Sequence, residues 1–255
     1  MSKIFDSLKR AEEERKNRAK GTEAGSNITP IRTAAVTPSG VDSSGFPEDL
    51  MRQLGILRNA VDSVLKGKER KTIVFTSAVS GEGTTTISSS FARLLALQGG
   101  GRVLLCEMNA RNPALKNLFG LNDDLGITDF FSGERNLPAV VHTTREPNLD
   151  VIPIGKKDPA LIQIHLQNVF PELARQASAI YETVIFDAPA IVNSPETAPM
   201  AAHVDGVVLV VHSGKTKREV VQRSIETIHR SDGAVLGVIL NRKKYYIPEF
   251  LYKRI

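Results

Sequence analysis

The stretch SAVSGEGTTT, from Ser77 to Thr86, decides the fold of this chain. An apolar run rich in Val and Ile precedes it (72–77), and apolar residues at helical spacing follow it (87–95). Strand, glycine-rich turn and helix in this order form the setting of a phosphate-binding loop. Glycines let backbone N–H groups curl around a polyphosphate, and the helix N-terminus adds partial positive charge. The sequence therefore predicts such a loop, with the Thr85 hydroxyl placed to hold Mg²⁺.

One position departs from the usual form of this loop. Between Gly83 and Thr85 the motif requires lysine, the cation that reaches the β- and γ-phosphates, and this chain has Thr84 there. Removing one charged donor from such a site costs on the order of 3 kcal/mol of transition-state stabilisation, or roughly 10²–10³ in rate. Binding should suffer less than transfer, because the backbone N–H groups and Thr85 remain.

Composition indicates a soluble α/β domain with extensions. The chain has 255 residues, of which 41% are hydrophobic and 24% charged. No apolar run approaches the ~20 residues that cross a bilayer, and the first residues lack the apolar segment of a secretory signal. The single cysteine, Cys106, lies in an apolar run and is expected to be buried, so a reducing cytoplasm is the expected compartment. The five histidines show no metal-ligand spacing and are expected to be structural.

Positive charge gathers at the two ends of the chain. Residues 1–20 carry seven Lys or Arg against four Asp or Glu, and residues 242–255 carry five against one. Basic ends of this kind suit a membrane surface, nucleic acid or an acidic partner. No tract interleaves basic and aromatic residues across the body of the chain, so nucleic acid is not expected.

The chain divides into four segments. Residues 1–20 predict a basic amphipathic helix, with a solvated, frayed tail as the alternative. Residues 21–47 are rich in Gly, Ser, Thr and Pro and predict a flexible linker. Residues 48–241 form the phosphate-loop domain, and residues 242–255 form a basic tail that contains tyrosines.

Strands and helices alternate through the domain. The expected strands are 72–77, 102–106, 149–153, 183–186, 206–211 and 235–240, and helices are expected at 48–65, 85–98 and 217–230. The strands are short and apolar throughout, as strands covered on both faces must be. The pattern predicts an α/β fold with a doubly wound, mainly parallel sheet. Ligands in such sheets bind beyond the carboxyl ends of the strands.

Polar residues follow three of these strands. The expected crevice gathers Glu107, Asn109, Arg111, Asp187 and Asn241 around the phosphate loop. Plainer roles stay open for several of them: Asp187 as a helix cap or turn residue, Asn241 as a turn residue, and Arg111 as a surface charge. For Gly81 and Gly83 the plainer role is that of a tight turn.

Several motifs together resemble the bacterial tyrosine kinases of capsule and exopolysaccharide synthesis, which are P-loop proteins related to the MinD and ParA ATPases. The resemblance covers roughly residues 48–255. The family loop Gly-Glu-Gly-Lys-Ser/Thr-Thr is matched by 81–86 except at Thr84. The family motif Asp-x-Asp-x-Arg-x-Pro is matched at 107–113 with Glu107 and Asn109 in place of the aspartates. A third motif, apolar-apolar-Asp-x-Pro-Pro, is matched at 185–190 with Ala190 as its last residue.

The resemblance implies roles for these residues. It implies ATP or ADP with Mg²⁺ as cofactors, bound weakly here. The implied nucleotide-binding residues are Gly81, Glu82, Gly83, Thr84, Thr85, Thr86, Arg111 and Asn241, the last by recognition of adenine. The implied catalytic residues are Glu107, Asn109 and Asp187, and the implied metal ligands are Thr85, Glu107 and Asp187.

The departures from the family pattern fall on residues of the chemistry. The lysine that MinD and ParA carry earlier in the loop would fall on Val79, so it cannot compensate for Thr84. Lys215 follows the 206–211 strand at the correct edge of the sheet and is the replacement cation that the sequence offers. A family helix motif that supports ring assembly aligns with Arg52, Gly55 and Arg58, and only the last matches.

The tail carries three of the four tyrosines, Tyr245, Tyr246 and Tyr252, which are phosphorylation candidates because family kinases end in a tyrosine cluster. The alternative is docking of the tail's basic and apolar residues at the inner face of the plasma membrane, or on a membrane partner.

The predicted function is a cytoplasmic, tyrosine-kinase-like P-loop protein of exopolysaccharide or capsule synthesis and export. A degenerate nucleotide-binding regulator or scaffold is favoured, with an active ATP-dependent tyrosine autokinase and a MinD/ParA-like positioning ATPase as alternatives. The implied partner is a membrane protein of the chain-length-regulator type. A homo-oligomer, or a hetero-oligomer with an active kinase, is also implied.

Overall fold

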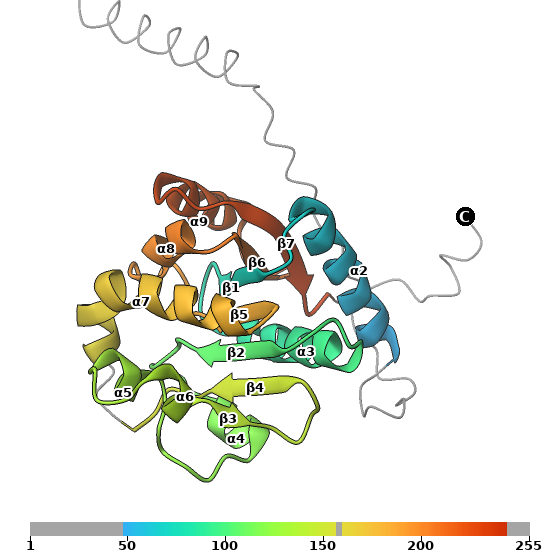
Figure 1. The fold of residues 1–255 in the computed structure, drawn as a ribbon. Coiled ribbons are helices and arrows are strands. Elements are labelled where there is room, and N and C mark those ends of the chain that lie inside the picture. Colours follow the sequence, from blue (N-terminus) through green and yellow to red (C-terminus); the bar gives the residue numbers. More distant parts are fainter. Residues whose placement is uncertain (1–47, 157–159, 244–255) are drawn as a thin grey trace, which may run out of the picture.

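A seven-stranded sheet forms the centre of the structure, a computed structural model that describes residues 48–156 and 160–243 (Figure 1). The strand order is β3-β4-β2-β5-β1-β6-β7, and every neighbouring pair is parallel except β3 with β4. The strands are β1 (Lys71–Ser77), β2 (Val103–Glu107), β3 (His142–Thr143), β4 (Leu149–Ile152), β5 (Thr183–Asp187), β6 (Gly206–His212) and β7 (Val235–Asn241).

Helices cover both faces of this sheet. One face packs against α2 (Glu48–Val64), α3 (Thr84–Leu97) and α4 (Leu115–Phe119). The other face packs against α5 (Ile127–Phe131), α6 (Leu137–Val140), α7 (Ala160–Ile180), α8 (Thr197–Met200), the 3₁₀ turn η1 (Ala201–His203) and α9 (Arg218–Arg230). None of the helices within the described ranges is long and apolar enough to cross a bilayer.

The strand order puts the phosphate loop at a switch point of the sheet. β1 lies in the interior between β5 and β6, and the chain runs from β1 toward β2 on one side and later to β6 and β7 on the other. Connections that leave in opposite directions open a crevice at the carboxyl ends of the strands. The loop that follows Ser77 lies in this crevice, as expected from the sequence.

Successive residues of β1 face opposite sides and join two separate cores. Val74 packs in the core between the sheet and α7, whereas Ile73 and Phe75 pack in the core that includes residues of α2 and α3. The ring of Phe75 lies 5.5 Å from that of Phe91 in α3. Because β1 enters the loop and α3 leaves it, this buried contact fixes both ends of the loop; burying a large apolar side chain contributes roughly 1.5–3 kcal/mol.

The predicted doubly wound, mainly parallel α/β fold is confirmed, and each predicted strand lies within one residue of the observed one. Cys106 is fully buried in β2.

Two features of the fold were not predicted from the sequence pattern. β3 has only two residues and adds an antiparallel edge to β4, and α7 continues through Pro171, a residue that normally ends a helix. The segments expected at 1–20 and 21–47, and the tail from residue 244 on with its three tyrosines, lie outside the described residues.

Candidate functional site

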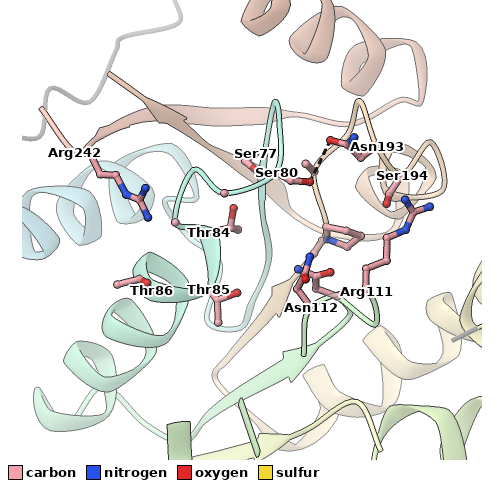
Figure 2. A pocket seen from close by; sticks show the side chains of 16 residues that line it. Ser77, Ser80, Thr84, Thr85, Thr86, Arg111, Asn112, Asn193, Ser194 and Arg242 are labelled. Carbon is pink, nitrogen blue, oxygen red and sulfur yellow. Dashed lines mark hydrogen bonds between the residues drawn. The ribbon is translucent and has the colours of Figure 1, made fainter. Parts of the chain in front are cut away.

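A polar pocket of about 470 Å³ lies at the carboxyl ends of the central strands (Figure 2). Its walls come from the phosphate loop, the segment after β2, the segment after β5 and the end of β7. The lining residues are Ser77, Ser80, Gly81, Gly83, Thr84, Thr85, Thr86, Asn109, Arg111, Asn112, Ala188, Pro189, Ala190, Asn193, Ser194 and Arg242.

The loop has the backbone shape of an anion cradle. Gly81 and Gly83 have φ of 83° and 94°, in the left-handed region that favours glycine. A Cβ atom on Gly83 would also collide with the Asn241 side chain. α3 begins directly after Gly83, and the N–H groups of its first turn have no carbonyl partner within the helix. The loop can therefore bind a phosphate-bearing ligand through its backbone.

Glu82 holds the loop in place rather than facing the pocket. Its side chain is buried, and Oε2 accepts a hydrogen bond from the Val79 N–H at 2.9 Å. Oε1 accepts from the His212 N–H at 2.8 Å and from the Thr216 hydroxyl. The sequence predicted that Glu82 binds nucleotide, but its carboxylate connects the loop to the end of β6. A buried carboxylate needs hydrogen-bond donors, and these N–H and hydroxyl groups supply them.

Thr85 and Asp187 form a hydrogen-bonded pair at the floor of the site. The Thr85 hydroxyl donates to Asp187 Oδ2 at 2.6 Å, and the Ser88 hydroxyl donates to Oδ1 at 3.1 Å. Asp187 is buried directly behind Thr85. The pKa of Asp187 is raised to about 7, mainly by burial and further by the nearby Glu107 carboxylate. The hydrogen bonds from Thr85 and Ser88 oppose this rise. Thr85 lines the pocket and Asp187 does not; that the two hold Mg²⁺ stays a prediction from the motif.

Glu107 does not line the pocket. Its fully buried carboxylate accepts hydrogen bonds from the backbone N–H groups of Ala114, Leu115 and Ile154, the last at 3.0 Å. Burial raises the pKa of Glu107 and the three N–H donors oppose that rise. The prediction that Glu107 is a metal ligand and catalytic group therefore does not fit this geometry. Its oxygens organise the loop between β2 and α4 instead.

The segment after β2 supplies the far wall of the pocket. Asn109, Arg111 and Asn112 line it, as the sequence predicted for the first two. The Asn109 Oδ1 atom is buried and has no hydrogen-bond partner among the described residues, and the same holds for the Ser194 hydroxyl. Across the pocket, Ser80 donates to Asn193 Oδ1 at 3.2 Å (Figure 2). Two buried oxygens without partners among residues that line the pocket suit a ligand that brings donors.

The end of β7 braces the loop and brings a cation. Asn241 Nδ2 donates to the Glu82 carbonyl at 2.8 Å, and Asn241 does not line the pocket. The Asn241 amide supports the loop in this geometry, and recognition of adenine by Asn241 stays a prediction. Arg242, assigned to the tail from the sequence, lines the pocket, whereas Lys215, the predicted replacement cation, does not.

A magnesium ion fits this site only with help from a ligand. No group of three or more His, Cys, Asp or Glu side chains that could hold a metal occurs in residues 48–156 and 160–243. Thr85 and Asp187 together offer one hydroxyl and one carboxylate. Mg²⁺ commonly takes one or two protein oxygens and completes its shell with phosphate oxygens and water. The donor set therefore suits a phosphate-bound Mg²⁺ rather than a metal held by protein alone.

Relatives of known name share most of the described domain. No protein-family model matches the chain. The tyrosine-protein kinase YwqD of Bacillus subtilis is 31% identical over 192 residues, which cover 75% of this chain and 81% of YwqD. The chain belongs to the bacterial tyrosine kinase family. The family resemblance read from the motifs is confirmed. The tyrosine-protein kinase CpsD of Streptococcus agalactiae is 33% identical over 69% of this family member and 77% of CpsD.

Another relative is a larger protein. The succinoglycan biosynthesis transport protein ExoP of Rhizobium meliloti is 29% identical over 189 residues, 72% of this chain and 24% of ExoP. Among solved structures, the kinase domain of Escherichia coli tyrosine kinase ETK has a TM-score of 0.73 at 23% identity, over 85% of both chains. MinD from Pyrococcus horikoshii, solved with Mg-ADP, has a TM-score of 0.59 at 21% identity, over 72% of this chain and 76% of MinD. These two likenesses concern the fold.

The sequence did not predict some residues that line the pocket: Ser80, Asn112, Asn193, Ser194 and Arg242. Asn193 and Ser194 follow β5 by six and seven residues, in a loop without a motif. The only signal for Arg242 was its position directly after the last strand, where the sheet rule places ligand-facing residues.

Proposed function

We propose that this protein is a kinase-like component of exopolysaccharide synthesis and export that binds ADP or ATP with Mg²⁺ and has lost most phosphoryl transfer. One observation carries the proposal: a complete backbone cradle with a Thr85–Asp187 pair contains threonine at the position of the phosphate-binding lysine. Family membership and the named role of ExoP support the link to polysaccharide.

The chain's own groups suit binding better than transfer. The N–H groups of the loop and of the α3 N-terminus bind phosphate oxygens, and Thr85 and Asp187 would hold the metal. Mg²⁺, when bound, would neutralise phosphate charge. At Asn109 an amide stands where the family carries aspartate, and an amide accepts no proton from an attacking hydroxyl.

We expect purified full-length protein to bind ADP and ATP measurably and to turn ATP over far below ~1 s⁻¹, the lower end of typical enzyme rates. Calorimetry with and without Mg²⁺ measures binding, and release of labelled phosphate measures turnover. The variant Thr85→Ala is the control, since turnover that survives it comes from a contaminant. Hydrolysis or autophosphorylation of the wild type at ~1 s⁻¹ or above would contradict the proposal.

An active tyrosine autokinase is the second candidate. The retained Thr85–Asp187 pair and the cation Arg111 at the pocket wall favour it. Phosphotyrosine on Tyr245, Tyr246 or Tyr252 after incubation with ATP and Mg²⁺ would identify this activity. ATP hydrolysis without phosphotyrosine would indicate instead the third candidate, a positioning ATPase of the MinD/ParA kind.

We also propose that residues 242–255 attach the protein to the inner face of the plasma membrane, directly or through a polysaccharide-export protein of the chain-length-regulator type. Each Lys or Arg near anionic lipid contributes about 1 kcal/mol, and the tail has four besides Arg242, which lines the pocket. A phosphate on a tail tyrosine adds roughly −1.5 to −2 charges and would oppose attachment. We further propose that the protein assembles with copies of itself or with an active kinase.

Membrane fractionation tests the tail. Cells expressing the full chain are expected to show salt-sensitive membrane association, and a chain ending at Arg242 is expected to lose most of it. Ending the chain after Arg242 keeps every residue that lines the pocket. Equal association of the two forms would exclude the tail as the anchor and direct attention to residues 1–20.

A further inference from the structure

Arg242 brings a guanidinium to the phosphate loop from the end of β7. It lines the same pocket as Thr84 and Thr86. In Figure 2 its side chain extends toward these two threonines, on the opposite side of the loop from Arg111. The pocket thus has an arginine at each end, although the loop itself has no cation.

The backbone at Arg242 is held in an unfavourable conformation. Its φ is 55°, in the left-handed region that residues other than glycine seldom occupy. The Arg242 N–H donates to Asn241 Oδ1 at 2.8 Å, while Asn241 Nδ2 donates to the carbonyl of Glu82 in the loop. The loop therefore sets the direction in which Arg242 leaves the strand. Strain of this kind persists where the surrounding structure enforces it, and it concentrates at functional sites.

The charge of Arg242 is available to an anion. Among the described residues, no carboxylate lies within ion-pair distance of its guanidinium, whereas Lys68, Lys71 and Lys116 each pair with an aspartate. The phosphate loop contains one carboxylate, that of Glu82. Its oxygens already accept hydrogen bonds from Val79, His212 and Thr216.

The position of Arg242 determines which phosphates of a bound nucleotide it would contact. Thr85 and Asp187 mark the metal end of the pocket, toward β5 and Arg111. Arg242 lies on the β7 side, next to Thr84 and Thr86 at the start of α3. In a nucleotide whose terminal phosphate is at the metal end, the phosphates nearest the nucleoside lie on the Arg242 side.

We propose that Arg242 is the phosphate-binding cation of this site and contacts the phosphates nearest the nucleoside in a nucleoside diphosphate or triphosphate. The inference rests on the proposed function, that the pocket takes a nucleotide. It assigns to a residue after β7 the positive charge that Thr84 does not supply. Since ADP and ATP both carry the α-phosphate next to the nucleoside, Arg242 supports the two ligands alike.

Calorimetry on the full chain tests the proposal with ADP, ATP and inorganic pyrophosphate as probes. Arg242→Gln is expected to weaken all three by about tenfold or more, because a charge-assisted hydrogen bond is lost. Arg242→Lys is expected to keep most of the affinity. Lys215→Gln is the matched control, since it removes one exposed cation outside the pocket, and is expected to bind like the wild type.

The outcomes separate this inference from the proposed function. If the wild type binds none of the probes, the proposed function fails first. If the wild type binds and Arg242→Gln binds equally well, the proposed function stands and the assignment of Arg242 is overturned. Loss of ADP and ATP binding in both Arg242→Gln and Arg242→Lys, with pyrophosphate unaffected, would also overturn it, because the guanidinium would then be stacking on the base.

Arg242→Gly distinguishes a binding role from a structural one. Glycine adopts φ near 55° without steric cost, so this variant is expected to unfold at a temperature no lower than the wild type. It is expected to lose nucleotide affinity as Arg242→Gln does. A glycine variant that melts lower and binds ADP normally would show that Arg242 serves the fold, and would overturn the proposal.

Discussion

Replacing Thr84 with lysine is expected to tighten ATP binding by about tenfold or more, because a charge-assisted hydrogen bond contributes roughly 1.5–3 kcal/mol. Thr84 is half-buried, opens α3 and lines the pocket, so a lysine there would extend into the space where phosphates are expected. The gain should be larger for ATP than for ADP, since lysine in this loop reaches the β- and γ-phosphates. Calorimetry of the full chain at fixed salt measures both affinities.

Thr84→Lys alone is not expected to restore phosphoryl transfer. Asn109 lies at the opposite wall with an amide where the family has a carboxylate. The double variant with Asn109→Asp is therefore expected to exceed the single variant in turnover, by roughly 10²–10³ if each group acts on the transition state. Gln222→Lys, on the exposed face of α9, adds the same charge away from the pocket and is the control. Unchanged ATP affinity in Thr84→Lys would mean that the loop is not shaped to hold phosphates.

The parts of the site that follow from local sequence were predictable. β1 has an apolar centre, Ile73 to Phe75, the loop has glycines at the two positions with φ near 90°, and Asp187 directly ends an apolar strand. Each of these signals resides in a few consecutive residues. The fold followed for the same reason, because uniformly apolar strands that alternate with amphipathic helices can pack only as a covered parallel sheet.

The parts that depend on distant partners were not predictable. Glu107 occupies a motif position for an acidic residue, yet its oxygens are taken by N–H groups of Ala114, Leu115 and Ile154, the last 47 residues away. Glu82 likewise bonds to His212, 130 residues later. A sequence motif gives the chemical type of a side chain but not the donors that the fold brings to it. Arg242 entered the site through the direction of its backbone, which no residue pattern records.

Replacing Asp187 with asparagine is expected to stabilise the folded protein above neutral pH. Asp187 is fully buried, and burial raises the pKa of its carboxyl to about 7 from an ordinary value near 3.8. The folded protein therefore binds this proton more tightly than the unfolded chain does. Between about pH 4 and pH 7 the free energy of unfolding falls as pH rises, and above pH 7 the buried charge costs up to roughly 4 kcal/mol.

Asparagine keeps the shape of the side chain and removes the charge. Since Thr85 and Ser88 would lose part of their hydrogen bonding, the expected gain at pH 8 is about 2 kcal/mol, with little change at pH 5. Denaturant unfolding of both proteins from pH 5 to pH 8 measures it. Asp62→Asn, which removes a carboxylate that is 40% exposed and paired with Lys71, is the control for loss of one negative charge outside the core.

The same substitution should abolish the effect of Mg²⁺ on nucleotide affinity, because a neutral amide is a poor ligand for a hard cation. If Asp187→Asn is more stable and no longer responds to Mg²⁺, the charge of Asp187 serves binding and destabilises the fold. A variant that is less stable than the wild type at pH 8 would contradict this account. Asp187 would then be a structural acceptor for Thr85 and Ser88, and the metal position in the pocket would have to be sought at other oxygens.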